Sequence, residues 1–221
     1  MEVCRIRTAE QYKRLSIEEF TKAAETYETD DAGIYEPCRA EYLSILKELE
    51  REPFEDLLDC GCGTGPMISL LHKRWPDRRY TSLGLTPKMI EVARAKALAN
   101  VRFVVGDCED IPFEDSSFDV AICSMSFHHY PNPQDFFDSV SHILRPGGKL
   151  VLNDSTGNAL MVWFINNVEL PLANLLHKGD VRIYSRKEIE RMCQESRLTL
   201  EVFRNDRLWH LHAVMRKPRA I

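Results

Sequence analysis

An aspartate and three glycines stand at alternate positions in the segment LDCGCGTGPM, residues 58–67. They are Asp59, Gly61, Gly63 and Gly65, between an apolar run typical of a strand and a helical pattern. Glycine permits a tight turn and lets the backbone approach a bound molecule closely, and the first N–H groups of a helix have no partner within it. The aspartate adds an acceptor for an ammonium group or for water. The segment therefore predicts a loop that binds a ligand carrying both a cation and a carboxylate.

The spacing of these glycines separates three classes of ligand. A dinucleotide fingerprint has the spacing G-x-G-x-x-G, and its third glycine would fall on Pro66 here. The phosphate-binding loop of nucleotide hydrolases needs G-K-[ST], which is absent after the last glycine. A nucleoside with an amino-acid tail in place of phosphates is the class that remains.

The cysteines suggest no second chemistry. There are 7 of them, without paired spacing. Cys60 and Cys62 form C-x-C and not the C-x-x-C of a redox dithiol, and no second cluster offers zinc its four ligands. Cys60 and Cys123 lie in apolar, strand-like runs. We therefore expect buried single thiols in a reducing compartment, and no metal.

Short apolar runs alternate with helical patterns from residue 54 onward, which is typical of βαβ units and a parallel sheet. Several runs are apolar at nearly every residue, as in strands buried on both faces. The pattern predicts an α/β fold: a Rossmann-like, doubly wound, seven-stranded sheet, mostly parallel with an antiparallel C-terminal hairpin strand, and helices on both faces. Expected strands are 54–60, 78–85, 101–107, 118–124, 149–154, 198–205 and 208–217, and expected helices are 36–50, 66–74, 87–99, 133–144 and 185–196, with a further helix start at Ser16.

Four segments together resemble a known family. D-x-G-x-G-x-G, beginning at Asp59, looks like the first motif of class I S-adenosylmethionine (SAM) dependent methyltransferases. GLTPKMIEVARAKA, VVGDCEDIPFEDSSFDVAICSMSFHHYPNPQDFF and LRPGGKLVLND resemble later segments of that family in the same order. The likeness covers about residues 20–215 and is greatest to the small-molecule branch, which includes ubiquinone and menaquinone biosynthesis C-methyltransferases. It implies SAM as the cofactor and S-adenosylhomocysteine as the product.

The resemblance assigns cofactor-binding roles to individual residues. It implies that Asp107 accepts from the adenine amine, that Cys108 donates its backbone N–H to the ring and that Met89 packs near the adenosine. Asp107 also reads as a turn residue after Gly106, and Met89 as helix core. The expected cofactor-binding set is Asp59, Gly61, Cys62, Gly63, Gly65, Gly84, Leu85, Met89, Asp107, Cys108, Ser124 and Met125, the last two on the methionine side.

One position departs from the family pattern. The second strand of the family ends in an acid that binds both ribose hydroxyls, and Gly84 stands there in this chain. Hydrogen bonds to a charged group contribute about 1.5–3 kcal/mol each, so losing two would weaken binding about a hundredfold or more. We expect that the acid is replaced by Thr86, by the backbone or by water, or that the cofactor binds weakly. A non-catalytic or altered-cofactor protein is the other explanation.

Two histidines and two lid segments point to the acceptor side. His129, which follows the fourth strand, is the candidate catalytic residue, because histidine is the natural base near neutral pH; a loop histidine at a helix entry is the alternative. The resemblance implies one methyltransferase domain over residues 1–221. Within it, residues 1–50 are expected to form an N-terminal helical lid, and residues 155–184 an inserted helical segment on the substrate side. In the resembling family such segments close over the active site. The second segment also suits a dimer or core helix. Expected acceptor-side residues are Tyr27, Tyr35, His128 and Trp163.

Composition limits the partners. The formal net charge is -5, which disfavours nucleic acid as a partner because phosphate binding needs a basic face. No apolar run reaches the ~18 residues of a membrane span, and the polar N-terminus is unlike a signal peptide, so we expect a cytoplasmic protein. The expected reaction is transfer of a methyl group from SAM to a small, partly apolar acceptor, with a homodimer left open. Arsenite methylation, with Cys60, Cys62, Cys108 and Cys123 as thiol ligands, is a weaker alternative.

Overall fold

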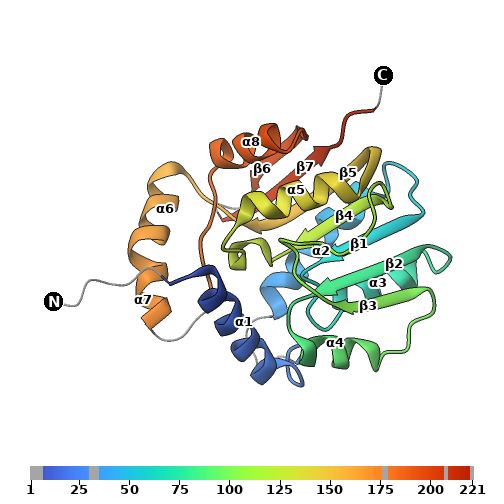
Figure 1. Cartoon of the computed structure of the whole chain (residues 1–221), viewed down its shortest axis with the longest axis horizontal. Coiled ribbons are helices and arrows are strands. Elements are labelled where there is room, and N and C mark those ends of the chain that lie inside the picture. Colours follow the sequence, from blue (N-terminus) through green and yellow to red (C-terminus); the bar gives the residue numbers. More distant parts are fainter. Residues whose placement is uncertain (1–6, 30–34, 176–178, 207–208, 220–221) are drawn as a thin grey trace.

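A seven-stranded sheet in the order β3-β2-β1-β4-β5-β7-β6 forms the centre of the molecule (Figure 1). The computed structural model describes residues 7–29, 35–175, 179–206 and 209–219. Strands β1 to β5 run parallel, while β7 is antiparallel to both of its neighbours. The predicted sheet, including its C-terminal hairpin, is therefore confirmed. The strands are β1 (Asp56–Cys60), β2 (Arg79–Gly84), β3 (Val101–Val105), β4 (Phe118–Ser124), β5 (Leu144–Ser155), β6 (Thr199–Asp206) and β7 (His210–Arg216).

Helices cover both faces of the sheet, because alternate strand residues point to opposite sides. Leu57 belongs to a core cluster with helices α2, α3 and α4, whereas Leu58 belongs to a cluster with α5 and α8. Continuous apolar strands are buried by these two layers. The helices are α2 (Tyr35–Leu49), α3 (Pro66–Arg74), α4 (Pro87–Arg94), α5 (Pro133–Ile143) and α8 (Arg186–Glu195).

Helix α2 is part of the core and not part of a lid. Its residues Tyr42, Ile45 and Leu49 are buried. Buried polar contacts fix it to β5: the Lys149 ammonium lies 3.0 Å from a Glu48 carboxylate oxygen. Among the described residues before α2, helix α1 (Ala9–Ala23) contacts elements at the ligand end of the sheet.

Helix α1 covers this end of the sheet (Figure 1). The expected start at Ser16 is wrong, because the helix begins seven residues earlier with a capping box of Thr8 and Gln11. Ser16 is instead a buried residue within the helix, and its hydroxyl donates to the Gly179 carbonyl at 3.4 Å. Helix α1 contacts α4 and the short 3₁₀ helix η2 (Phe127–His129), both at the carboxyl end of the sheet.

The inserted segment forms α6 (Ala159–Phe164), the π-helical turn η3 (Ile165–Glu169) and α7 (Leu170–Leu175). These elements stand beside the sheet in Figure 1 and share a small core of Val162, Ile165, Leu170 and Ile183. Several large apolar side chains point outward here, namely Leu160, Trp163, Phe164 and Leu172. Among the described residues, no helix combines the length and the apolar character needed to cross a bilayer.

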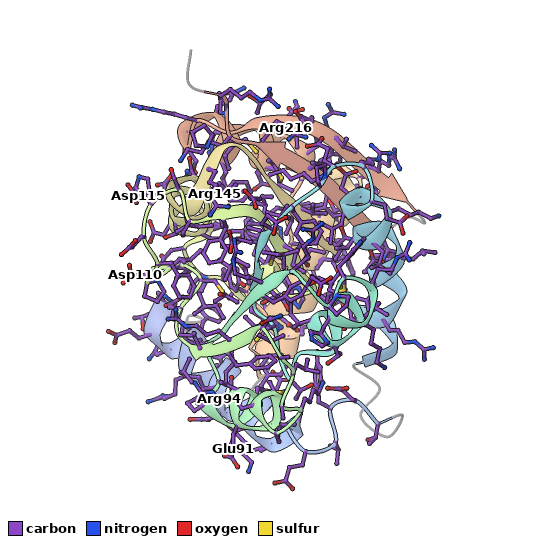
Figure 2. All side chains as sticks on the ribbon, turned by 90° about the vertical axis from the view of Figure 1, so that its right-hand side faces the viewer. Glu91, Arg94, Asp110, Asp115, Arg145 and Arg216 are labelled. Atoms are coloured by element: carbon purple, nitrogen blue, oxygen red, sulfur yellow. The ribbon has the colours of Figure 1, made fainter. Side chains whose placement is uncertain are left out.

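Ion pairs join the amino ends of the strands, opposite the ligand end. Arg145 pairs with Asp56 at 2.8 Å and with Asp119 at 2.7 Å, and Arg79 adds a second pair to Asp56 at 2.6 Å. The neighbouring guanidinium groups lower the pKa of Asp56. Arg145 and other labelled charged side chains, Glu91, Arg94, Asp110, Asp115 and Arg216, lie at the periphery of the molecule (Figure 2). This network ties β1, β2, β4 and β5 together where no ligand is expected.

Candidate functional site

A cavity opens at the carboxyl ends of β1, β2 and β4, where the strand order reverses. In open α/β sheets, ligands bind at such a switch point. The cavity holds about 90 Å³, below the roughly 300–1,000 Å³ typical of ligand pockets, because helix α1 lies over it. Its walls are Lys13, Ser16, Phe20, Tyr27, Gly61, Gly63, Gly84, Leu85, Thr86, Met89, Asp107, Cys108, Met125, Ser126, His129, Tyr130 and Pro131. Most of the residues predicted to bind the cofactor are therefore brought together.

The glycines of the loop after β1 serve different purposes. Gly61 has φ +76°, and a Cβ atom there would lie 1.9 Å from the Ser126 hydroxyl, so the loop after β4 can approach only a glycine. Gly65, with φ +78°, caps α3 and packs against Phe103, where a Cβ would be 2.8 Å from the ring. Gly65 does not line the cavity. Gly61 therefore shapes the site, and Gly65 sets the packing of helix on sheet.

Asp59 is the unpaired charge of the site. It is 2% exposed, and its Oδ2 atom has no hydrogen-bond partner among the described residues. Burial raises the pKa of the Asp59 carboxyl to about 7. The aspartate borders a second, smaller cavity with Ser124 and Cys62, and the Ser124 hydroxyl is also without a partner there. A carboxylate beside an unpaired hydroxyl fits a ligand that brings its own ammonium group.

The adenine-side aspartate has a partner that the sequence did not reveal. Lys13 of helix α1 extends its ammonium to within 2.6 Å of Asp107 Oδ2 and also pairs with Glu109. The other Asp107 oxygen accepts from the Glu109 backbone N–H at 2.9 Å. The Lys13 ammonium thus donates to the same Asp107 carboxylate to which an adenine amine is expected to donate. The contact also fixes α1 over the cavity.

Removing the Lys13 charge is expected to tighten nucleoside binding modestly. A partly exposed ion pair contributes about 0–1 kcal/mol, so K13M, which keeps the apolar stem, should lower the Kd for SAM about two- to fivefold. Calorimetry measures the change, with K22M on the exposed side of the same helix as control. Weaker binding by K13M would mean that the lysine holds the ligand and does not compete with it.

Gly84 ends β2 at the cavity wall, as expected of the position that holds the family's acid. A Cβ atom there would lie 3.2 Å from Ile90 Cδ1 and 3.4 Å from Cys62 Sγ. Thr86, two residues further on, is buried and also lines the cavity.

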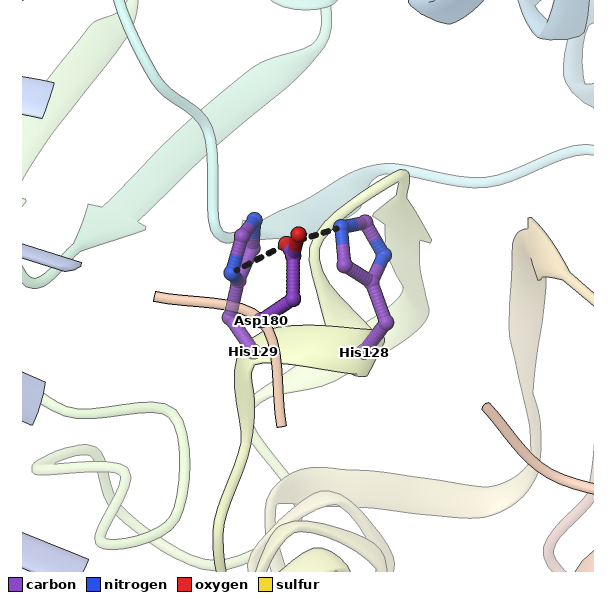
Figure 3. Close-up of side chains that lie close together, drawn as sticks. All are labelled: His128, His129 and Asp180. Atoms are coloured by element: carbon purple, nitrogen blue, oxygen red, sulfur yellow. Dashed lines mark ion pairs between the residues drawn. The ribbon is translucent and has the colours of Figure 1, made fainter. Parts of the chain in front are cut away.

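The two histidines occupy different positions. His129 lines the cavity and packs edge to face on Phe20, whereas His128 lies behind it, outside the lining. His128 Nδ1 is 2.7 Å from Asp154 Oδ1, and its Nε2 is 3.6 Å from Asp180 Oδ1. His129 Nδ1 is 3.3 Å from the same Asp180 oxygen (Figure 3).

The charges around His128 and His129 shift the pKa values of the two imidazoles in opposite directions. Burial opposes protonation of both rings, but Asp154 and Asp180 outweigh it at His128 and raise its pKa to about 9. Burial and the neighbouring His128 charge lower the pKa of His129 to about 4. Without a bound ion, His128 is therefore cationic and His129 neutral at pH 7.

The other residues predicted on the acceptor side occupy different positions relative to the cavity. Tyr27 lies in the cavity wall and packs over Gly63, nearer the glycine loop than the acceptor side. Trp163 is 58% exposed on α6 and lines no part of the cavity. Tyr35 begins α2, but its side chain lies outside the described residues. Tyr130, which directly follows His129, lines the cavity and was not predicted. Three further residues were not predicted because they approach from elements distant in the chain, namely Lys13, Asp154 and Asp180.

Among the described residues, no thiol belongs to a group of side chains that could hold a metal ion. Cys60 on β1 lies opposite Cys123 on β4 in the parallel register, and both free thiols are fully buried. Burial raises the pKa of Cys62 and Cys123, and a hydrogen bond to Cys108 together with burial raises that of Cys60. Because the thiolate is the metal-binding form, these neutral thiols argue against arsenite as the acceptor.

The cavity at the switch point, the glycine loop and the buried acid together are features of a ligand site in an open α/β sheet. Residues 58–152 match the family model described as "Methyltransferase domain". This part of the chain is therefore similar to a methyltransferase domain.

Known relatives agree with this assignment. The malonyl-[acyl-carrier protein] O-methyltransferase of Herminiimonas arsenicoxydans is 32% identical over 64% of this chain and 51% of its own length. The fatty-acid O-methyltransferase of Mycolicibacterium smegmatis is 36% identical over 45% of this chain and 36% of its own. The chain thus spans about half or less of the curated relatives that it matches.

A solved structure shows the same fold. The 1,6-didemethyltoxoflavin-N1-methyltransferase of Burkholderia thailandensis, with bound 1,6-didemethyltoxoflavin and S-adenosylhomocysteine, superimposes with a TM-score of 0.69. The match covers 97% of this chain and 92% of that one at 17% identity. The two chains therefore share their fold over most of their length.

Proposed function

We propose that the protein transfers the methyl group of SAM to a small, partly apolar acceptor. The observation that carries this proposal is the buried, unpaired Asp59 carboxylate in a glycine-rich cradle. SAM brings an ammonium group for Asp59, a carboxylate for the loop N–H groups and an adenine amine for Asp107. Its sulfonium supplies an activated methyl group that leaves a neutral thioether when the acceptor attacks.

The chain contributes alignment and exclusion of water to this reaction. Correct orientation of two reactants can supply ~7–11 kcal/mol of a barrier. Helix α1 closes the cavity through Lys13 and Phe20, and Met125 holds a left-handed backbone, φ 51°, where β4 ends at the cavity. Phe20 and His129 pack edge to face in the cavity wall. An acceptor seated on that wall approaches the methyl group without bulk water between them.

The acceptor proposed here is an acyl chain with a terminal oxygen group. The cavity wall is largely apolar, with Phe20, Leu85 and Met89 among its members. The relatives at 32% and 36% identity carry names that refer to malonyl-[acyl-carrier protein] and to fatty acids. Carboxylate oxygens on such chains are nucleophiles without a proton to lose near pH 7, so the site needs to orient them more than to deprotonate them.

A turnover assay tests this proposal. Purified protein is incubated with SAM and free or thioester-linked acyl acids of graded length, and S-adenosylhomocysteine formation is measured. Acceptor-dependent product that is lost in D59N supports methyl transfer. SAM binding without product from any acceptor would favour the second candidate, a non-catalytic SAM-binding protein, for which the missing acid at Gly84 is the supporting observation.

His129 is proposed to orient the acceptor from the cavity wall. Replacing it by alanine is expected to lower kcat about a hundredfold, because small misplacements of reactants cost about that much. The Kd for SAM should change less than about twofold, because His129 is assigned to the acceptor and not to the cofactor. The exposed His142 provides the control H142A. Unaltered turnover in H129A would remove His129 from the mechanism.

We also propose a cytoplasmic setting and a homodimer. The described cysteines Cys38, Cys60, Cys62, Cys108, Cys123 and Cys193 are free thiols, which suits a reducing, cytoplasmic environment. The outward apolar residues of α6 and α7, Leu160, Trp163, Phe164 and Leu172, offer a face for a homodimer. Sedimentation of the wild-type protein beside W163E tests the second point, and identical monomeric behaviour would contradict it.

A further inference from the structure

Two histidines and one aspartate converge beside the acceptor cavity. His128 Nε2, His129 Nδ1 and an Asp180 oxygen lie within 4.8 Å of one another, and the three side chains point toward a common space (Figure 3). We propose that His128, His129 and Asp180 bind one divalent transition-metal ion of the zinc type. The proposal concerns a binding site and stands whether or not the chain transfers methyl groups.

The distances within the cluster suit metal ligands better than a hydrogen-bonded network. His129 Nδ1 is 3.3 Å and His128 Nε2 is 3.6 Å from Asp180 Oδ1. Charge-assisted hydrogen bonds are shorter, about 2.7–2.9 Å. Donor atoms bonded to zinc at about 2.0–2.1 Å in a tetrahedron lie about 3.3–3.4 Å apart. Both histidine-to-aspartate distances are therefore close to those between two ligands of a shared ion.

His129 gives an independent indication. Its Nδ1 atom is buried and makes no hydrogen bond to any described residue, although it faces the Asp180 carboxylate. Buried polar atoms without a partner are rare in folded proteins and call for an explanation, of which a bound ion is one. Coordination satisfies this nitrogen and brings the carboxylate oxygen onto the same centre.

The backbone holds the three ligands in place before any ion binds. His128 and His129 are consecutive on η2, and their ring centroids are 4.1 Å apart. The segment that carries Asp180 is fixed to η2, because the N–H groups of Val181 and Arg182 donate to the His128 carbonyl at 2.9 and 3.2 Å. Rigid elements of this kind lower the entropic cost of assembling a site.

Asp154 supplies the outer contact that metal-binding histidines usually have. Its Oδ1 atom is 2.7 Å from His128 Nδ1, which leaves Nε2 of that ring directed toward Asp180. The same carboxylate accepts from the backbone N–H of Ser155 at 2.6 Å. A carboxylate on the far nitrogen orients the ring and makes it a stronger ligand.

The ligand set also indicates which ions fit. Two imidazoles and one carboxylate suit zinc, iron(II) or cobalt(II), while magnesium and calcium prefer oxygen ligands throughout. Three protein ligands leave a fourth position, as in catalytic zinc sites. Because His129 also lines the cavity, that position lies on the acceptor side, where water or an acceptor oxygen would complete the coordination.

Metal titration tests the proposal directly. Chelator-treated protein is titrated with Zn²⁺ by calorimetry and with Co²⁺ by visible absorption, whose intensity reports tetrahedral coordination. One ion per chain with a nitrogen and oxygen ligand spectrum is expected. Failure of the folded wild-type protein to bind either ion stoichiometrically, or preference for Mg²⁺, would overturn the proposal. Methyl transfer does not enter this readout, so its failure is distinguishable from failure of the metal site.

Variants locate the ion. D180N and H129Q each remove one ligand and should abolish stoichiometric binding, and D154N should weaken it about 10- to 100-fold. The exposed His142 gives the control H142Q, which should bind as wild type does. Circular dichroism confirms that each variant is folded; should D180N not fold, H129Q alone decides. Undiminished binding by the folded ligand variants would overturn the assignment.

Discussion

Asp59→Asn is expected to weaken SAM binding by at least about a hundredfold while making the ligand-free protein more stable. The carboxylate is buried without a partner, so the folded chain pays for a charge that only the ligand neutralises. Hydrogen bonds between charged groups contribute about 1.5–3 kcal/mol each, and asparagine keeps the shape but removes the charge. Calorimetry with SAM and thermal unfolding without it measure both effects.

The pH dependence follows from the pKa of Asp59. Burial raises that pKa from 3.8 to about 7, so the folded state binds more protons than the unfolded state between about pH 4 and 7. The free energy of unfolding therefore falls as pH rises through this window. The loss approaches about 4 kcal/mol at and above pH 7, at about 1.4 kcal/mol per unit. SAM affinity changes in the opposite direction, rising toward pH 7 as the carboxylate ionises.

The difference in the free energy of unfolding between wild type and D59N separates the titration of Asp59 from that of the other groups. The stability advantage of the variant should be small at pH 4 and largest at pH 8. S124A, which removes the unpaired hydroxyl beside the acid, is the matched control and should show no such pH dependence. A stability difference independent of pH, or undiminished SAM binding by D59N, would contradict the assigned role.

Gly84→Asp is expected to tighten SAM binding about a hundredfold. An acid here would restore two charged hydrogen bonds to the ribose, at about 1.5–3 kcal/mol each. The position faces the cavity, and the atoms that a new Cβ would meet are Ile90 Cδ1 at 3.2 Å and Cys62 Sγ at 3.4 Å. Both are ends of side chains and can shift by tenths of an ångström, so the crowding costs less than the new bonds supply.

Two controls separate the carboxylate from the crowding. Gly84→Ala adds the same Cβ without an acid and should bind SAM slightly more weakly than wild type. An S-adenosylmethionine analogue lacking the ribose hydroxyls should gain nothing from G84D. Equal affinities of G84D and wild type for SAM would show that Thr86 or the backbone already satisfies the ribose, or that the ribose lies elsewhere.

Local patterns explain why much of the fold was predictable. Strand β4 and helix α3 were placed at their observed limits, because each combines a distinct apolar periodicity with a clear stop signal. The start of α1 was misplaced, because Ser16 followed by acids imitates a cap, while the true cap uses Thr8 and Gln11. A capping residue contacts only the first turn of its helix, so the sequence alone does not distinguish the cap at Thr8 from the similar pattern at Ser16.

The site was predictable only where it is local in sequence. The glycine loop and the strand ends carry their spacing in short motifs, and the cavity contains most of them. Lys13 and Asp107 are 94 positions apart, and His128 and Asp154 are 26 apart. Such contacts arise from the packing of α1 and β5, which no periodicity records. Trp163 was expected beside the acceptor for its apolar neighbours alone, and the fold turns it to the surface.

Calorimetric titration of the folded wild-type protein with SAM, and separately with S-adenosylhomocysteine, is the most direct test of the proposed cofactor site. One molecule of each is expected to bind per chain, with D59N binding neither at the same concentrations. A wild-type protein that is shown to be folded and that binds neither compound would contradict the assignment of the cavity to SAM and, with it, the proposed methyl transfer.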